Sequence, residues 1–188
     1  MQSLIRNDLQ VIGKKYATDK SAHRFKGLTY LQVYDLYLRD FRYNSPSVSL
    51  LEIGVKSGGS LKMWQEYFGK AARIVGIDKN PACEKNNVLL IKNIRVYTGL
   101  QDDKKFLLKV MKFEKEFNII IDDASHEIIK TIHSFNILWS FVKSGGFYII
   151  EDIKHLDKIF LKLISYLDKR KDMRFLHLYP QLCIIGKV

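Results

Sequence analysis

Ser49-Leu50-Leu51-Glu52-Ile53-Gly54-Val55-Lys56-Ser57-Gly58-Gly59-Ser60 is the stretch that decides the expected fold of this 188-residue chain. It opens as a short apolar run, which is typical of a buried strand in a parallel sheet. A glycine-rich turn follows, and residues 61–68 then show a helical pattern, with Ser60 expected as the N-cap. A strand, a glycine turn and a helix in this order place backbone N–H groups and a helix N-terminus at a sheet edge, where ligands bind.

Two acidic residues bear on the kind of ligand. Glu52 stands at the strand end, where it would repel a pyrophosphate but suit the amino group of an amino-acid moiety. The next expected strand, residues 72–78, ends at Asp78, roughly 20 residues after the turn, where nucleotide-binding βαβ units hold ribose hydroxyls. Gly54 allows positive φ and close approach of a ligand to the backbone. Spacing alone therefore predicts an adenosine-type ligand.

The rest of the chain predicts an α/β, Rossmann-like fold with a mostly parallel seven-stranded sheet. Apolar runs predict further strands at residues 94–97, 117–122, 147–150, 173–179 and 182–187. Helical patterns cover residues 103–114, 127–142 and 154–169, and Ser144-Gly145-Gly146 is expected to end the second. Only Pro180-Gln181 separates the last two strands, which permits a hairpin and excludes a helical crossover, so the C-terminal hairpin is expected to be antiparallel.

The length predicts one domain over residues 1–188. Within it, residues 1–45 are expected to form a helical cap or lid, and residues 46–188 the Rossmann-like core. The polar segment at residues 16–23 reads as a loop, and a second helix is expected after it. The alternative to a lid is an N-terminal cap that merely packs on the sheet.

Composition bounds the class of protein. Hydrophobic residues at 47% and charged residues at 27% exclude a disordered chain, and no apolar run is long enough to cross a bilayer. The first residues lack the apolar core of a secretory signal, and the two distant cysteines are expected to be free thiols, so a cytoplasmic location is expected. The formal net charge of +11 is spread along the chain, which indicates either a solvated surface or attraction to an anionic acceptor.

Acidic residues also follow two other expected strands. One carries Asp122-Asp123-Ala124-Ser125-His126, and another carries Glu151-Asp152. The carboxyl ends of parallel strands meet at one edge of a sheet, so these side chains are expected to converge there. A lone aspartate at such a place is commonly a helix N-cap. Clustered carboxylates repel one another, however, and oxygen ligands suit Mg²⁺, with Mn²⁺ as the alternative.

The glycine turn with Glu52 and Asp78 resembles the class I S-adenosylmethionine (SAM) methyltransferases. The pattern Asp-Asp-x-Ser-His, followed by Gly-Gly-x-Tyr-x-Ile-Glu-Asp, is similar to metal-dependent sugar O-methyltransferases of the macrocin, mycinamicin and rhamnosyl type. Tyr16-x-Thr18-Asp19-Lys20 is similar to the entry segment of that family. The family often has an acidic residue directly after the position of Gly99, but Leu100 stands there, which leaves Gln101 and Asp102 as substitutes.

The resemblance implies a function and assigns roles to residues. It implies SAM-dependent methyl transfer to a sugar hydroxyl, with the acceptor held near a metal ion. The implied residues are Glu52, Gly54, Ser60, Asp78, Gln101, Asp102 and Asp122 for the cofactor, Asp123, Glu151 and Asp152 for the metal, and His126 as general base.

Several alternatives stay open. A SAM-dependent RNA methyltransferase would explain the net charge, but it leaves Glu151-Asp152 without a role and no nucleic-acid module is recognisable. A hydroxylase-like member of the same family would use the scaffold for other chemistry. The acceptor is expected to be a glycan, a sugar nucleotide or a glycosylated natural product. The chain has no long insertion to serve as a substrate domain, which leaves room for a homo-oligomer whose partner subunit completes the site.

Overall fold

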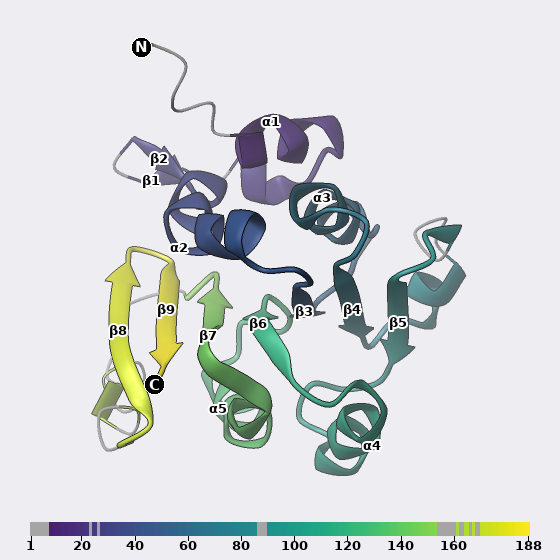
Figure 1. Ribbon diagram of the computed structural model, residues 1–188. Helices are drawn as coiled ribbons and strands as arrows, with labels where there is room; N and C mark the ends of the chain where they lie inside the picture. The colour runs from purple at the N-terminus through teal and green to yellow at the C-terminus, as the bar shows by residue number, and fades with distance from the viewer. Residues whose placement is uncertain are drawn as a thin grey trace.

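The computed structural model describes residues 8–22, 24–25, 27–85, 90–153, 161, 164–165, 167 and 170–188. In these residues a central sheet lies between two layers of helices (Figure 1). One layer holds α1 (Asp8–Lys15), α2 (Tyr30–Asn44) and α3 (Gly59–Phe68), and the other holds α4 (Lys104–Glu114) and α5 (Ile128–Leu138). Within the described part of the chain, no helix combines the length and the apolar character needed to span a bilayer.

The sheet has seven strands in the order β5-β4-β3-β6-β7-β9-β8. The strands from β5 to β7 run parallel, and β9 is antiparallel to both β7 and β8. Their bounds are β3 (Ser49–Ile53), β4 (Arg73–Asp78), β5 (Ile94–Thr98), β6 (Phe117–Asp122), β7 (Val142–Glu151), β8 (Met173–Tyr179) and β9 (Leu182–Lys187). The predicted fold class and the antiparallel C-terminal hairpin are confirmed.

Successive side chains of each strand belong alternately to two separate hydrophobic cores. Leu50 and Ile74 belong to the core under α1, α2 and α3, whereas the next residues, Leu51 and Val75, belong to the core under α4 and α5. This follows from the two-residue period of a strand, and it explains the continuous apolar runs of strands that are buried on both faces. The N-terminal helices share their core with the sheet, because Leu9 lies in the same cluster as Leu50. The proposed division into cap and core stays a prediction.

The cap holds more structure than the sequence indicates. Between α1 and α2 lie a short 3₁₀-helix, η1 (Asp19–Ser21), and a two-stranded ribbon of β1 (Arg24–Phe25) and β2 (Leu28–Thr29). Thr29 ends the ribbon and caps α2: its hydroxyl accepts from the Gln32 N–H, and the Gln32 side chain accepts from the Thr29 N–H. This capping box fixes the start of the helix that runs over the sheet.

Two local predictions were wrong. The helix expected over residues 127–142 ends as α5 at Leu138, followed by the 3₁₀-helix η4 (Trp139–Phe141), and β7 starts at Val142. The Gly145-Gly146 pair therefore lies inside a strand, where Gly145 has φ +72° and the pairing of β6 with β7 shifts register. Ser60 is the second residue of α3, and the N-cap is Gly58, in the left-handed conformation.

The helix expected over residues 154–169 lies mostly outside the described residues. Leu161, Ile164, Ser165 and Leu167 are described, and all four are helical. Leu167 is fully buried and belongs to the core under α4 and α5.

Candidate functional site

A pocket of about 510 Å³ opens at the carboxyl ends of the parallel strands, with the 3₁₀-helix η1 on its rim. This is the end of an open α/β sheet where ligands bind. The lining comes from the entry segment and from the ends of five strands: Ala17–Lys20, Ile53–Ser57, Gly59, Ser60, Ile77–Lys79, Gly99–Asp102, Asp123–Glu127, Lys130 and Asp152.

The glycine turn forms one wall of the pocket. Gly54 has φ +101°, and a Cβ at this position would lie 2.1 Å from the backbone oxygen of Asp123. Any side chain here would therefore push the β3 turn away from the β6 turn. Ser60, on the first turn of α3, is 8% exposed and lines the pocket. The structure thus brings Gly54 and Ser60, two of the seven predicted cofactor residues, to the pocket.

Asp78 lies at the end of β4, across from the glycine turn. Its Oδ2 accepts from the backbone N–H groups of Val55 (2.8 Å) and Lys56 (2.9 Å), and its Oδ1 accepts from the N–H of Asn80 (2.8 Å). Burial raises the pKa of Asp78, but the three backbone hydrogen bonds outweigh this and hold it below its ordinary value. The carboxylate is therefore charged and fixed at the pocket wall.

Gln101 and Asp122 form a pair at the third wall. Gln101 lines the pocket, donates to Asp122 Oδ1 (3.1 Å), and accepts from the Ser125 N–H (2.9 Å). Asp122 is 2% exposed and also accepts from Ser134 and Tyr148 on the α5 side of the sheet. Burial raises the pKa of Asp122 to about 6. Asp122 therefore lies behind the pocket lining and orients Gln101, whereas Asp102 lies on the lining itself.

Glu52 does not line the pocket. It is fully buried, its Oε2 accepts from the Trp64 indole N–H (3.0 Å), and its Oε1 lies 3.1 Å from Lys20 Nζ. Burial raises the pKa of Glu52, and the nearby ammonium of Lys20 opposes that rise. The predicted acid at the end of β3 is thus separated from the pocket by Lys20, which is on the lining.

Glu151 also turns inward. Its Oε1 accepts from the Tyr34 hydroxyl (2.5 Å) and lies 2.8 Å from Lys20 Nζ. Burial, together with the charge of Asp123, raises the pKa of Glu151, and Lys20 opposes this. Burial lowers the pKa of Lys20, but the charges of Glu151, Asp123 and Glu52 outweigh it and hold that pKa well above its ordinary value.

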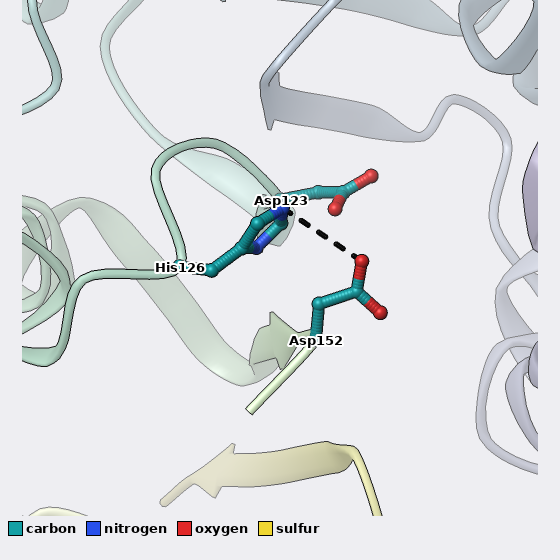
Figure 2. Close-up of side chains that lie close together, drawn as sticks. All are labelled: Asp123, His126 and Asp152. Atoms are coloured by element: carbon teal, nitrogen blue, oxygen red, sulfur yellow. Dashed lines mark ion pairs between the residues drawn. The ribbon is translucent and has the colours of Figure 1, made fainter. Parts of the chain in front are cut away.

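The other acidic residues converge on the pocket. Asp123, His126 and Asp152 each offer one ligand atom, and these three atoms lie within 4.8 Å of one another. His126 and Asp152 point toward each other, with Nε2 3.7 Å from Oδ2, as Figure 2 shows. Asp152 Oδ1 accepts from the Tyr30 hydroxyl (2.9 Å). The structure therefore brings together three of the four predicted metal and base residues and places Glu151 behind them.

Backbone strain is concentrated around the pocket. Non-glycine residues with positive φ, among those described, are Ala17, Lys56, Lys115, His126 and Asp152. All except Lys115 line the pocket. Such conformations cost free energy and persist where the surrounding structure enforces them, commonly at functional sites. The strained residues His126 (φ +58°) and Asp152 (φ +53°) are therefore two of the three residues whose ligand atoms lie close together.

Lys20 is a pocket residue to which the sequence assigned no role. Its only signal is its place in the Tyr16-x-Thr18-Asp19-Lys20 motif. Its side chain is 2% exposed, an unusual state for a lysine, which is almost never buried unless paired. Tyr30 and Tyr34, on the first turns of α2, were likewise assigned no role from the sequence.

Comparisons with known proteins find relatives of the chain. The chain is 35% identical over 155 residues to an 8-demethyl-8-(2-methoxy-alpha-L-rhamnosyl)-tetracenomycin-C 3'-O-methyltransferase of Streptomyces olivaceus, covering 78% of this chain and 37% of that protein. It is also 35% identical over 155 residues to a mycinamicin VI 2''-O-methyltransferase of Micromonospora griseorubida, covering 78% and 36%. The chain is related to sugar O-methyltransferases. No protein-family profile matches it.

A solved structure shares the fold. The MycE methyltransferase of the mycinamycin biosynthetic pathway, in complex with Mg, SAH and mycinamycin VI, superposes with a TM-score of 0.78 at 28% identity, covering 96% of this chain and 54% of MycE. The resemblance predicted from the motifs and the methyltransferase fold are both confirmed. The chain spans little more than a third of the length of the curated relatives it matches.

Proposed function

We propose that this chain binds SAM and a divalent cation and transfers a methyl group to a hydroxyl of a sugar. The observation that carries the proposal is the convergence of Asp123, His126 and Asp152 on one wall of the pocket whose other walls present the glycine turn and Asp78. The proteins named above act on glycosylated natural products, which supports a sugar-bearing acceptor for this chain.

The pocket residues fit SAM. Gly54 and Ser60 leave the backbone of the β3 turn and the start of α3 open to the cofactor, and Asp78 offers a charged acceptor to the ribose. Gln101 and Asp102 line the same pocket, which supports the adenine contacts that the resemblance implies for them. Two predicted cofactor residues would act indirectly: Asp122 orients Gln101, and Glu52 lies behind Lys20.

The donor set fits a divalent cation. Asp123 and Asp152 provide carboxylate oxygens, which Mg²⁺ and Mn²⁺ accept, and their side chains are 18% and 23% exposed. Glu151, the third predicted acid, is engaged by Lys20 and Tyr34 in the described structure. A cation bound here would lower the pKa of a coordinated sugar hydroxyl, and SAM would supply the electrophilic methyl group.

His126 is the proposed general base. Its Nε2 faces Asp152 Oδ2 at 3.7 Å, too long for a hydrogen bond, so this nitrogen can accept a proton from an acceptor hydroxyl. Its side chain is 27% exposed and lines the pocket. The Tyr30 hydroxyl donates a hydrogen bond to Asp152, and this bond fixes the position of the carboxylate relative to the imidazole of His126.

The deciding experiment measures transfer of labelled methyl from SAM to a panel of rhamnosides and other deoxysugar glycosides. Exhaustive treatment with EDTA should abolish transfer, and Mg²⁺ or Mn²⁺ should restore it. Asp123→Asn should lose transfer while binding SAM normally, whereas Asp40→Asn, an exposed change on α2, should leave both unchanged. The product should gain one CH₂ in mass.

Two outcomes would contradict the proposal. Full transfer after removal of metal would exclude the cation and leave a methyltransferase in which His126 acts alone. SAM binding without transfer to any sugar hydroxyl would exclude the acceptor class.

An anionic acceptor, assembly into a homo-oligomer and a cytoplasmic location stay predictions.

A further inference from the structure

Two tyrosines on one face of α2 donate to the acidic pair at the end of β7. The Tyr34 hydroxyl donates to Glu151 Oε1 (2.5 Å), and the Tyr30 hydroxyl donates to Asp152 Oδ1 (2.9 Å). The tyrosines are four residues apart in a helix, so they lie one above the other, while the two acids are neighbours in the sequence. The first turns of one helix therefore hold both members of the acidic pair.

Both tyrosines are fully buried, which makes the target of each hydroxyl informative. A buried hydroxyl costs free energy unless it has a hydrogen-bond partner, so phenylalanine would suit either position if only the ring mattered. Tyr30 has other acceptors nearby, the Oε1 (3.2 Å) and the backbone oxygen (3.3 Å) of Gln181, yet its hydroxyl lies closest to the carboxylate of Asp152. The two hydroxyls are therefore directed at the acids.

The next tyrosine along the helix, Tyr37, provides an internal comparison. Its hydroxyl lies 2.8 Å from His177 Nδ1 and 2.8 Å from the Tyr179 hydroxyl, both on the edge strand β8. Tyr37 therefore ties α2 to the edge of the sheet, whereas Tyr30 and Tyr34 tie the same helix to the acids beside the pocket.

The helix is fixed at the end that carries the two tyrosines. The capping box of Thr29 and Gln32 sets the start of α2 directly before Tyr30. The ring of Tyr34 packs edge-on against Trp64, with 5.4 Å between the ring centroids, and both tyrosines belong to the core under α1, α2 and α3. The positions of both hydroxyls are therefore set by the helix and its packing, independently of any ligand.

We propose that Tyr30 and Tyr34 are positioning residues that orient Asp152 and Glu151 for a divalent cation, so that α2 supports the metal site as well as covering the sheet. This inference rests on the proposed function. Residues that donate hydrogen bonds to ligating carboxylates fix the direction of the oxygens, and their loss commonly lowers metal affinity roughly 10–100-fold.

The charge of the donor matters for this role. Lys20 Nζ also lies 2.8 Å from Glu151 Oε1, but an ammonium and a metal cation repel each other. The hydroxyl of Tyr34 is a neutral donor, so it can keep its hydrogen bond to a carboxylate that also binds a cation. A carboxylate has two oxygens and about four lone-pair sites, which leaves room for both partners. The tyrosines can therefore hold the acids with or without the ion.

The test titrates Mn²⁺ into the full chain, follows free Mn²⁺ by electron paramagnetic resonance, and measures SAM affinity separately by calorimetry. Tyr34→Phe and Tyr30→Phe each remove one oxygen and keep the ring, and each should weaken Mn²⁺ binding roughly 10–100-fold. SAM affinity should stay unchanged, because neither tyrosine lines the pocket. The matched control is Tyr37→Phe, which removes a hydroxyl from the same helix and should leave Mn²⁺ affinity unchanged.

A merely structural role for the two hydroxyls predicts a different pattern. The substitutions would then lower the midpoint of urea denaturation and leave the Mn²⁺ affinity of the folded protein unchanged. That result would overturn the inference, and so would an equal loss of Mn²⁺ affinity in Tyr37→Phe. If Tyr34→Phe fails to fold, Tyr30→Phe decides, since the Asp152 side chain is 23% exposed and water can replace the lost donor.

The two proposals fail separately. If the unaltered chain binds Mn²⁺ and both variants bind it as tightly, the inference about the tyrosines alone is overturned. If the unaltered chain binds no Mn²⁺, the metal of the proposed function is excluded and the inference is overturned with it. If the unaltered chain binds Mn²⁺ but transfers no methyl group to a sugar, the proposed acceptor is excluded, and weaker Mn²⁺ binding by the two variants still supports the inference.

Discussion

Among the described residues, two clusters of charge, each built around a buried side chain, lie at opposite ends of the parallel strands. At the carboxyl ends, Lys20 stands among three acids. At the other end, Glu114 stands among donors: Arg73 Nη1 lies 2.6 Å away, Arg95 Nη1 3.1 Å and the Tyr97 hydroxyl 2.6 Å. The first cluster has too few positive charges, and the second has one acid with more donors than it needs.

The difference in charge compensation distinguishes the candidate functional site around Lys20 from the structural cluster around Glu114. The charge of Glu114 is fully compensated, and the cluster ties the C-terminus of α4 to the first residues of β4 and β5. The carboxylates around Lys20 are not fully compensated, so their repulsion is relieved by protonation, which the raised pKa of Glu151 favours, or by a further cation. A cluster whose surplus charge is buried is therefore a candidate site, whereas the surplus positive charge around Glu114 lies on Arg73 and Arg95, whose side chains are 30% and 62% exposed, and that cluster contributes stability.

The largest expected effect tests the functional cluster. His126→Asn should lower turnover by roughly 10²–10⁴-fold, the usual contribution of a general base. Asparagine tolerates the left-handed backbone of His126, so the free energy of unfolding should change little. Steady-state methyl transfer and urea denaturation check the two parts, with His133→Asn, an exposed change on α5, as the control. A rate near that of the unaltered chain would remove His126 from the mechanism.

A smaller effect should follow from altering the structural cluster. Glu114→Gln removes the charge that Arg73 and Arg95 share, and it should lower the free energy of unfolding by about 1–3 kcal/mol, the range for a lost partner of buried polar groups. Turnover of the folded variant should be unchanged. Loss of turnover without loss of stability would contradict the distinction drawn between the two clusters.

The smallest expected effect is a pH dependence of the free energy of unfolding, caused by titration of Glu114. Burial raises the pKa of Glu114, but hydrogen bonds from Tyr97, Arg95 and Arg73 outweigh this and hold it below the ordinary value of 4.5. The unfolded chain therefore binds a proton more readily than the folded chain does. The stabilisation is fully present above about pH 4.5 and is lost as the pH falls through the folded-state pKa.

In Glu114→Gln this part of the pH dependence should be absent. The difference in unfolding free energy between the two proteins should therefore narrow as the pH falls from 6 toward 3 in urea denaturation. A constant difference across this range would show that the Glu114 charge contributes nothing to stability.

Local sequence determined the sheet and the place of the site. The runs at residues 117–122 and 182–187 are strands with the predicted bounds, because apolar residues in short runs have few other ways to be buried. Residues 173–179 also have the predicted bounds, but they form an edge strand without a buried residue. Asp78, Asp123 and Asp152 line the pocket as expected, because parallel strands bring their carboxyl ends to one edge. The methyltransferase resemblance followed from the same residues.

Tertiary structure decided which acids face the pocket and what faces them. Asp122 and Asp123 are neighbours in sequence, yet one points toward α5 and the other toward the pocket, since successive side chains alternate across a strand. The start of β7 depends on a register shift against β6 that no local pattern encodes. Lys20 meets Asp123 across 103 residues of sequence, and only the assembled strand ends make burial of its charge favourable.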